Sequence, residues 1–593
     1  ANKFYMKKLL PVLITLALIT SCGGPEPVVE EGEKMVELKG FYIHNDVKEK
    51  IYAGGMFRMN EVEDFKNLYP HSLVDVVSHR IANQVYQGLL KFSQETLEIE
   101  GNIASNWKIS EDGRTYTFQI RKGVFFHDDP CFPEGKGREV TAEDVKYCFT
   151  KLCEFGGNNK LFGMFQDRVV GANAYYDATK NGSADDISVN GIQVTGDYEV
   201  KIMLEKPFAA FEKVIAHNCC WIFPKEAVDK YGNDMRTRCV GTGPFQVLEV
   251  EEGKKVLLEK NPSYWGKDEF GNSLPYLDLV KFTFAKEKKT ELLQFNKGAL
   301  DLMFKLPVEE MGTVMGSVDD AQTGKGLKYQ YQSIPALGTQ YYGFLHTADY
   351  FKDRRVRQAF NLAIDRDKLI DYTLQGEGHP ATHGFVPPME IYDIKKVDGF
   401  EFDVERAQLL MAEAGYPGGK GFPEITLFFN EGGQTNTIAA QAIRNMIEEN
   451  LGVTLKMERM QFSTLIEQFT TGKCEMWRTA WVADYPDPEN FLKLFYGKTV
   501  PLGENESSFP NAHRYNNPQF DSIFELALAE MDSEERNRLY VACDQLLIDD
   551  AAFISLYYDE YIRLLGLNVR NFPQNAMEYR DMTEVFLSKE KKK

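Results

Sequence analysis

The chain has 593 residues, of which 43% are hydrophobic and 13% aromatic, so it can bury a large core and should divide into more than one domain. Its formal net charge is −20 and its only basic tract is the C-terminal KEKKK, which argues against a partner bound through a phosphate backbone. Charged residues are spread along the chain without repeats or low-complexity tracts, as is typical of a folded, non-repetitive protein.

The first 24 residues have the pattern of an export signal. Lys7 and Lys8 precede an apolar run, Leu9 to Ile19, and a zone of small residues follows it. The apolar run is too short to span a membrane, so we expect residues 1–21 to form a signal peptide. The run LITSC resembles a bacterial lipobox, which implies a lipid on Cys22 and a flexible tether over residues 22–35. A signal peptide that merely ends beside a cysteine is the alternative.

Further along the chain, α and β patterns alternate. Residues 106–126 predict a hairpin with its turn at SEDG, and Thr141 with Asp144 predicts a capped helix start. A second helix is predicted within DRRVRQAFNLAIDRDKLIDYTL, because five apolar residues share one face: Val356, Ala359, Phe360, Ala363 and Ile364. The stretch IAAQAIRNMIEENLG predicts another amphipathic helix, ended by Gly452 and followed by a strand.

The chain contains none of the common catalytic motifs, including GxSxG, HExxH, a Walker loop and a helix-opening GxGxxG. His379 and His383 are predicted to be loop residues, since Pro380 and flanking glycines disfavour a helical metal pair. His127 has acidic neighbours and could contact a metal or ligand, although we expect an exposed turn residue. We therefore predict no catalytic residues, no metal and no cofactor.

Eight cysteines follow Cys22, without the paired spacing of zinc sites. Outside the cytoplasm a disulfide from Cys219 or Cys220 to Cys239 can persist. Buried free thiols are the alternative, and the sequence does not choose between them.

Several stretches together resemble one protein family. They are ASNWKISEDGRTYTFQIRKGVFFHDD with TAEDV, GTGPFQVLEV with NPSYWG, DRRVRQAFNLAIDRDKLI, ERAQLLMAEAGYPGG, and WRTAWVADYPDPENF with RYNNPQFD. In this order they are similar to landmarks of the family 5 extracellular solute-binding proteins, the peptide- and nickel-binding components of bacterial ABC importers. The similarity covers about residues 70–565. It implies an α/β, periplasmic-binding-protein-like fold of two lobes with an additional inserted domain. Gly241 and Gly243 of GTGPF are expected to serve backbone turns, without a phosphate.

The resemblance also implies how the chain divides. Lobe I would comprise residues 36–86, 211–335 and 556–593, and the inserted domain residues 87–210. Lobe II would comprise residues 336–555.

The stretch MWRTAWVADY, read as a strand, places Arg478 and Asp484 on the same face. Six extended residues separate them by roughly 20 Å, too far for a direct ion pair. Only Ala480 and Val482 lie between them on that face, so another backbone could pair with the strand. An extended peptide fits this pattern, with its α-ammonium at Asp484 and its α-carboxylate at Arg478.

The resemblance implies the same two roles. In the oligopeptide-binding members, the aspartate of W-x-A-D-Y binds the peptide amino terminus, and an arginine six residues earlier meets the carboxylate of short peptides. Further candidate contacts are Trp481, Ala483, Tyr485, Asp75 and Val76. Structural roles are the alternatives: a turn cap for Asp484, an acidic partner across the sheet for Arg478, and core packing for the two aromatic residues.

These inferences predict a monomeric, lipid-anchored receptor on the periplasmic side of a bacterial membrane, which delivers short peptides to ABC permease subunits and binds no nucleic acid. A binding protein for an oligosaccharide or chelated nickel is an alternative. So is an exported hydrolase, or a surface lipoprotein without a permease.

Overall fold

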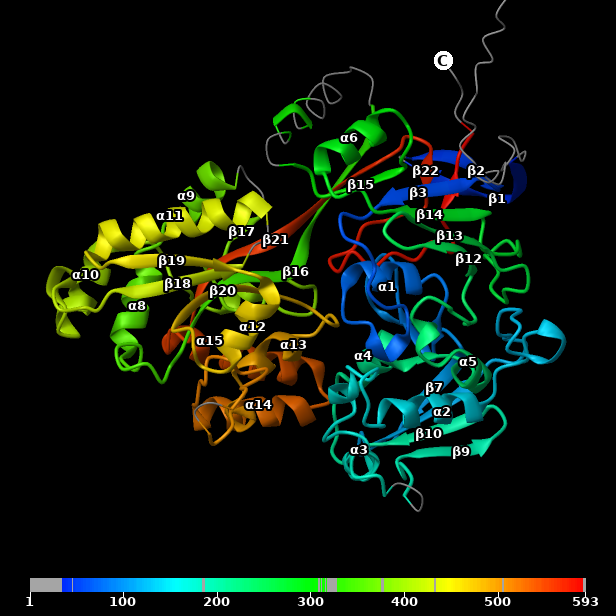
Figure 1. The fold of residues 1–593 in the computed structure, drawn as a ribbon, viewed down its shortest axis with the longest axis horizontal. Coiled ribbons are helices and arrows are strands. Elements are labelled where there is room, and N and C mark those ends of the chain that lie inside the picture. Colours follow the sequence, from blue (N-terminus) through cyan, green and yellow to red (C-terminus); the bar gives the residue numbers. More distant parts are fainter. Residues whose placement is uncertain are drawn as a thin grey trace, which may run out of the picture.

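Two bodies of mixed sheet and helix lie side by side in the computed structural model (Figure 1). The structure describes residues 35–589 except 45, 184–186, 308–309, 311, 315, 317–327, 375–377, 431–432 and 504–505. The predicted signal peptide, Cys22 and residues 22–34 of the tether lie outside this part of the chain. No helix within it is long and apolar enough to cross a membrane.

One body contains a four-stranded sheet built from distant parts of the chain. Its strand order is β12-β13-β14-β3, with β3 parallel to β14 and the other pairs antiparallel. The strands are β3 (Met56–Asn60), β12 (Phe245–Glu251), β13 (Lys255–Lys260) and β14 (Leu279–Thr283). The hairpin of β1 (Val36–His44) and β2 (Val47–Ala53) precedes it. The chain thus leaves this sheet after β3 and returns to it with β12.

The intervening segment forms its own antiparallel sheet, in the order β7-β8-β10-β9. Its strands are β7 (Ala104–Ile109), β8 (Thr115–Ile120), β9 (Ile192–Gly196) and β10 (Glu199–Met203). The predicted hairpin is confirmed as β7 and β8. Helix α2 (Ala142–Leu152) begins with the predicted capping box, and α3 (Ala172–Lys180) follows it.

A larger sheet dominates the other body, with the order β15-β21-β16-β20-β18-β19 and β17 paired to β21. Its strands are β15 (Leu302–Phe304), β16 (Gln330–Phe344), β17 (His379–Pro380), β18 (Ile425–Asn430), β19 (Leu455–Met460), β20 (Met476–Val482) and β21 (Phe553–Leu565). Helices α8 (Arg354–Leu362), α11 (Gly433–Leu451) and α12 (Phe462–Thr470) of the same body pack against it. Helix α10 (Val404–Glu413) packs on α8 and α11, and α14 (Pro518–Ala529) packs on α15 (Ser533–Asp549). All five predicted apolar residues of the α8 region are fully buried, although α8 itself ends at Leu362.

Strands β16 and β21 run from this body toward the other one (Figure 1). They pair over most of their length, with shifts in register between Pro335 and Thr339 and between Gln340 and Tyr341. The expected lobe boundaries at 335/336 and 555/556 fall inside these two strands. Two neighbouring strands that cross from one lobe to the other can serve as a hinge, so boundaries inside β16 and β21 fit a closing molecule. The domain limits themselves stay a prediction.

The prediction of an exposed His127 is wrong. Its side chain is buried, its Nε2 donates to the carbonyl oxygen of Gly243 at 2.9 Å, and its Nδ1 accepts from the Gly241 N–H at 3.3 Å. Burial lowers the pKa of His127 to about 4, so the ring is neutral at pH 7. At both glycines a Cβ atom would meet the backbone of Gln84 or Val85 within 2.5 Å, which is a packing reason for the GTG motif.

The eight cysteines after Cys22 are unpaired. Cys219 and Cys220 are buried side by side, with their Sγ atoms 3.7 Å apart, and neither forms a disulfide with Cys239. Of the two alternatives left open by the sequence, the structure shows free thiols.

Candidate functional site

Strand β20 has the predicted alternation of side chains. Trp477 and Thr479 are buried on one face, whereas Arg478 and Ala480 are half-buried and Val482 is 43% exposed on the other. The strand ends at Val482, so Asp484 lies two residues beyond it, in the following turn. Arg478 and Asp484 are therefore presented at opposite ends of one accessible stretch.

One edge of this stretch is open. Strand β16 pairs with β20 from Met476 to Val482, but β18 pairs only with Met476 and Trp477, and no other described strand continues along residues 478–482. The Ala483 N–H donates to the Leu337 carbonyl at 3.0 Å, so the odd-numbered residues direct their backbone groups toward β16. The N–H and C=O groups of Arg478, Ala480 and Val482 consequently face the unpaired side. Strands β18 and β20 are parallel, and the opening lies where they diverge toward their carboxyl ends, a common ligand position in α/β sheets.

The Asp484 carboxylate is positioned by the short helix α13 (Glu489–Leu492) and the residue after it. Its Oδ2 atom accepts from Asn490 Nδ2 at 3.0 Å and from Lys493 Nζ at 3.1 Å. Asn490 is fully buried, and its Oδ1 accepts from the Asp484 N–H and the Trp481 Nε1–H. Asp484 Oδ1 has no hydrogen-bond partner among the described residues, and the side chain is 37% exposed. One carboxylate oxygen is thus fixed and the other is available.

The electrostatic surroundings keep Asp484 ionised. Burial raises the pKa of its carboxyl, but the positive charges of Lys493 and His217 together with the Asn490 hydrogen bond lower it below the ordinary value. His217 follows α4 (Phe211–Ala216) in the opposite body, so this interaction crosses the boundary between the two bodies.

Arg478 has only neutral hydrogen-bond partners within the described chain. Its Nη1 donates to Asn430 Oδ1 at 2.9 Å and its Nη2 donates to Gln340 Oε1. Gln340 in turn donates to both carboxylate oxygens of Asp559 at 3.1 Å. No described carboxylate forms an ion pair with Arg478, so the structure does not show the acidic partner considered as the alternative role. A half-buried guanidinium without a counter-ion is suited to an incoming carboxylate.

The aromatic candidates differ in accessibility. Trp481 is half-buried beside Asp484, whereas Tyr485 is fully buried and its hydroxyl donates to Glu489. Tyr485 is therefore part of the core in this structure. Ala483 is also buried, with its N–H bonded to β16. Of these candidates, only Trp481 offers side-chain surface.

Asp75 caps helix α1 (Val76–Ala82), and its carboxylate accepts from the Ser78 N–H at 2.9 Å and the Ser78 hydroxyl at 2.7 Å. Val76 is 55% exposed. The segment lies near His217, because the neighbouring Asn218 donates to the carbonyl of Leu73 at 3.3 Å. The structure therefore brings Val76 toward the Asp484 end of the boundary between the bodies, while Asp75 has a sufficient structural role.

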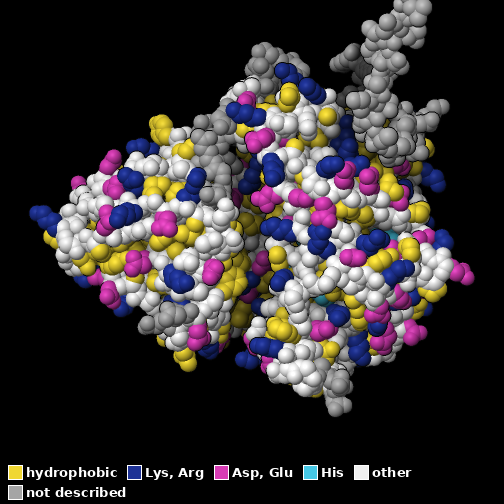
Figure 2. All heavy atoms as spheres, viewed as in Figure 1, with side chains coloured by type: hydrophobic (Ala, Val, Ile, Leu, Met, Phe, Trp, Pro, Cys, Tyr) yellow, Lys and Arg dark blue, Asp and Glu magenta, His cyan; other side chains and the backbone are white. Residues whose placement is uncertain are grey.

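Direct contacts join the two bodies next to Asp484. Lys213 of α4 donates to the Pro486 carbonyl at 2.8 Å and to Asp487 Oδ2 at 2.7 Å, and Arg168 lies 3.6 Å from Glu489. The space-filling view shows a furrow between the bodies (Figure 2). The loop that carries Asp484 therefore also carries the contacts that hold the bodies together on this side.

Sequence reasoning missed several of these residues. Asn490 and Lys493 follow Asp484 by six and nine positions, and a turn followed by a helical start in DYPDPENFLK was the available signal that they fold back. His217, Gln340 and Asn430 carried no local signal, because only the tertiary fold brings them to the site.

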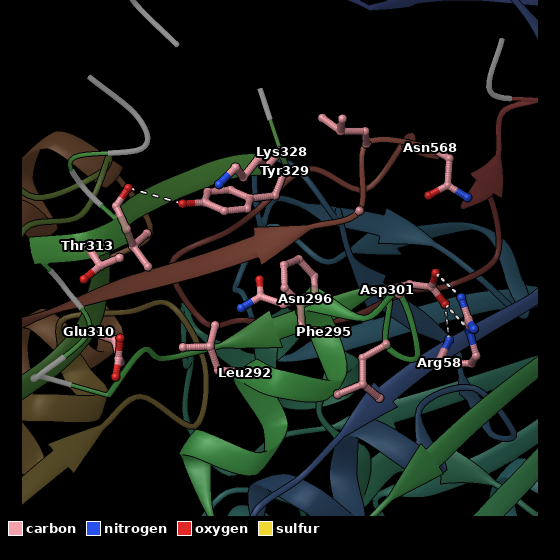
Figure 3. Close-up of a pocket in the computed structure, with 15 residues that line it drawn as sticks. Arg58, Leu292, Phe295, Asn296, Asp301, Glu310, Thr313, Lys328, Tyr329 and Asn568 are labelled. Carbon is pink, nitrogen blue, oxygen red and sulfur yellow. Dashed lines mark hydrogen bonds and ion pairs between the residues drawn. The ribbon is translucent and has the colours of Figure 1, made fainter. Parts of the chain in front are cut away.

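A separate cavity of about 710 Å³ lies elsewhere in the molecule (Figure 3). It borders helix α6 (Lys288–Asn296), the start of β16 and the turn after β21, and the Arg58–Asp301 ion pair of 2.9 Å lies at one end. None of the candidate residues lines it. No cluster of three or more His, Cys, Asp or Glu side chains fit to hold a metal occurs in the described part of the chain.

Comparison with known proteins is consistent with this geometry. The family model of bacterial extracellular solute-binding proteins, family 5 Middle, matches residues 98–501. The oligopeptide-binding protein OppA of Bacillus subtilis (strain 168) is 27% identical over 506 residues, 83% of this chain and 85% of the relative. The periplasmic oligopeptide-binding protein OppA of Escherichia coli (strain K12) is 24% identical over 515 residues, 85% of this chain and 87% of the relative.

Solved structures share the fold. The ABC transporter-associated periplasmic binding protein DppA from Helicobacter pylori, in complex with peptide STSA, aligns with a TM-score of 0.74 at 23% identity. The alignment covers 91% of this chain and 99% of that protein. The predicted α/β, two-lobed, periplasmic-binding-protein-like fold is thereby confirmed.

Proposed function

The chain belongs to the family 5 bacterial extracellular solute-binding proteins, and we propose that it captures short peptides between its two lobes and delivers them to an ABC permease. The relatives named for oligopeptide binding support a peptide over an oligosaccharide or chelated nickel. The protein acts as a receptor and performs no covalent chemistry.

The observation that carries the proposal is the open edge of β20 between two complementary charges. The backbone groups of Arg478, Ala480 and Val482 can pair with an extended ligand as an added strand. At one end Asp484 Oδ1 accepts the α-ammonium, and at the other Arg478 donates to the α-carboxylate. These contacts recognise features that every free peptide has, so they allow varied side chains.

Other candidate residues take supporting roles. Trp481 lines the ammonium end, while Tyr485 and Ala483 hold the loop and strand in place. Val76 contacts the ligand from lobe I when the lobes close, and Asp75 keeps α1 in position. Closure on a hinge at β16 and β21 encloses the ligand.

The cellular setting follows from the leader. Residues 1–21 are removed, Cys22 carries the lipid, and residues 22–35 tether the receptor to the membrane on its periplasmic side, within reach of the permease.

The decisive experiment is native mass spectrometry on a form that starts at Gly23, purified gently and then denatured to release its ligand. We expect a series of short peptides of mixed sequence that share a narrow range of lengths. A single sugar, a metal chelate, or an empty protein that ignores added peptides would contradict the proposal.

A further inference from the structure

Lys493 already neutralises the aspartate that is proposed to receive the ligand ammonium. Its Nζ lies 3.1 Å from Asp484 Oδ2 and 5.5 Å from the ring centroids of both Trp481 and Tyr485. Its side chain is only 21% exposed. The ammonium is therefore held in place by a carboxylate and two aromatic rings and is not a freely moving surface lysine.

The charges around Asp484 do not favour a ligand group that carries only a positive charge. Asp484 contributes one negative charge and Lys493 one positive charge, and His217 adds further positive potential when protonated. A ligand ammonium that approaches Asp484 Oδ1 thus meets an ion pair without net charge. Repulsion from Lys493 offsets much of its attraction to the carboxylate.

Lys493 also has unused hydrogen-bonding capacity. An ammonium has three N–H donors, and Asp484 Oδ2 is the one acceptor of Lys493 among the described residues. In the described part of the chain, the free N–H donors of the Lys493 ammonium and the free Oδ1 of the Asp484 carboxylate therefore lie side by side and carry opposite charges. The ligand complementary to such a pair carries an ammonium and a carboxylate that are also side by side.

We propose that Lys493 is a specificity-determining residue that makes the site prefer peptides whose first residue is aspartate or glutamate. The α-ammonium of such a peptide binds Asp484 Oδ1, and its first side-chain carboxylate binds Lys493. Peptides with a neutral first residue offer only the ammonium and leave the Lys493 repulsion uncompensated. This inference rests on the proposed peptide function and names the ligand class of the same site.

The test is isothermal titration calorimetry with ligand-free protein and peptides of three to five residues that differ only in the first residue, Glu or Gln. Lys493→Gln is the test variant. Lys498→Gln is the matched control, since Lys498 pairs with Glu525 on the surface. Circular dichroism and thermal unfolding establish that the variants are folded.

We expect the wild type and Lys498→Gln to bind the Glu-first peptide roughly tenfold or more tightly than the Gln-first peptide. Lys493→Gln should lose this preference and bind the Gln-first peptide more tightly than the wild type does. Equal affinities for the two peptides in the wild type, or an unchanged ratio in Lys493→Gln, would overturn the role of Lys493 while leaving peptide binding intact. Absence of binding by any peptide to any of the proteins would instead overturn the proposed function, and this inference with it.

Discussion

At the scale of single residues, the two charged groups of the candidate site, Arg478 and Asp484, have different surroundings. Arg478 keeps its charge among neutral amide oxygens, whereas Asp484 is held by the buried amide of Asn490 and by Lys493. A half-buried charge without a counter-ion gains most from a ligand of opposite charge. We therefore expect the carboxylate contact at Arg478 to contribute at least as much affinity as the ammonium contact at Asp484.

Replacing Arg478 tests that expectation. Arg478→Gln should weaken binding of peptides with a free C-terminal carboxylate by about tenfold to a hundredfold, because a charge-assisted contact is lost. The same peptides with an amidated C-terminus should bind the variant and the wild type alike. Calorimetry over a series of peptide lengths measures both affinities, with Arg444→Gln of the half-buried pair Arg444–Glu448 as the control. An equal loss for free and amidated peptides at every length would contradict the assignment.

Replacing Asp484 tests the other end. Asp484→Ala should weaken binding of peptides with a free amino terminus by about tenfold or more, since the ammonium loses its acceptor. N-acetylated peptides bring no ammonium and should lose little. Competition against a fluorescent peptide gives both affinities. If acetylated and free peptides lost the same factor, Asp484 would act only in holding the turn.

At the scale of elements, the sequence predicted those features that neighbouring residues determine. The β7–β8 hairpin, the capping box of α2 and the alternation along β20 were predicted because neighbouring residues determine them. His127 was misjudged because its acidic neighbours indicate exposure, while its burial depends on Gly241 and Gly243, more than a hundred residues away. The sequence offered Arg478 and Asp484 as candidates but not His217, which only the packing of α4 brings near Asp484.

Helix α15 fixes the segment after β17 through a buried carboxylate. Asp544 accepts from the N–H groups of Phe385 and Val386 at 2.7 and 3.2 Å and from the Tyr392 hydroxyl at 2.9 Å. Burial raises the pKa of Asp544 from 3.8 to about 6, although these three hydrogen bonds oppose the shift. The protonated form is therefore favoured in the folded state relative to the unfolded state.

The raised pKa of Asp544 makes the free energy of unfolding depend on pH. The folded state binds the proton more tightly, so the contribution of Asp544 is most favourable below pH 4 and declines as the pH rises to about 6, by about 3 kcal/mol in total. Asp544→Asn removes the titration and keeps an acceptor for the Phe385 N–H. Urea unfolding at pH 4 and pH 7 should show that the variant loses less stability than the wild type across this range. An identical pH dependence in both proteins would contradict the assignment.

At the scale of the whole molecule, the proposed ligand contact at Asp484 and the contacts between the two lobes lie on one loop. Asp484 is the proposed acceptor of the ligand ammonium, and three residues later the almost fully buried Asp487 accepts from Lys213 of the other lobe. A ligand that fixes this loop also fixes the surface on which the lobes meet. Closure should therefore be favoured by binding at Asp484, although Lys213 is not one of the proposed ligand contacts.

Removing Lys213 should separate closure from recognition. Lys213→Met leaves Asp487 buried without its cation, so closed conformations become less favourable and the ligand dissociates faster, by about tenfold. The loss should be the same for free, acetylated and amidated peptides, unlike the selective losses at Asp484 and Arg478. Stopped-flow dissociation measures the rate, and small-angle scattering should show a larger radius of gyration for the ligand-free variant that contracts when peptide is added. Lys225→Met, which removes an exposed pair with Asp229, is the control. A dissociation rate and a radius equal to those of the wild type would mean that the lobes are held together by other contacts.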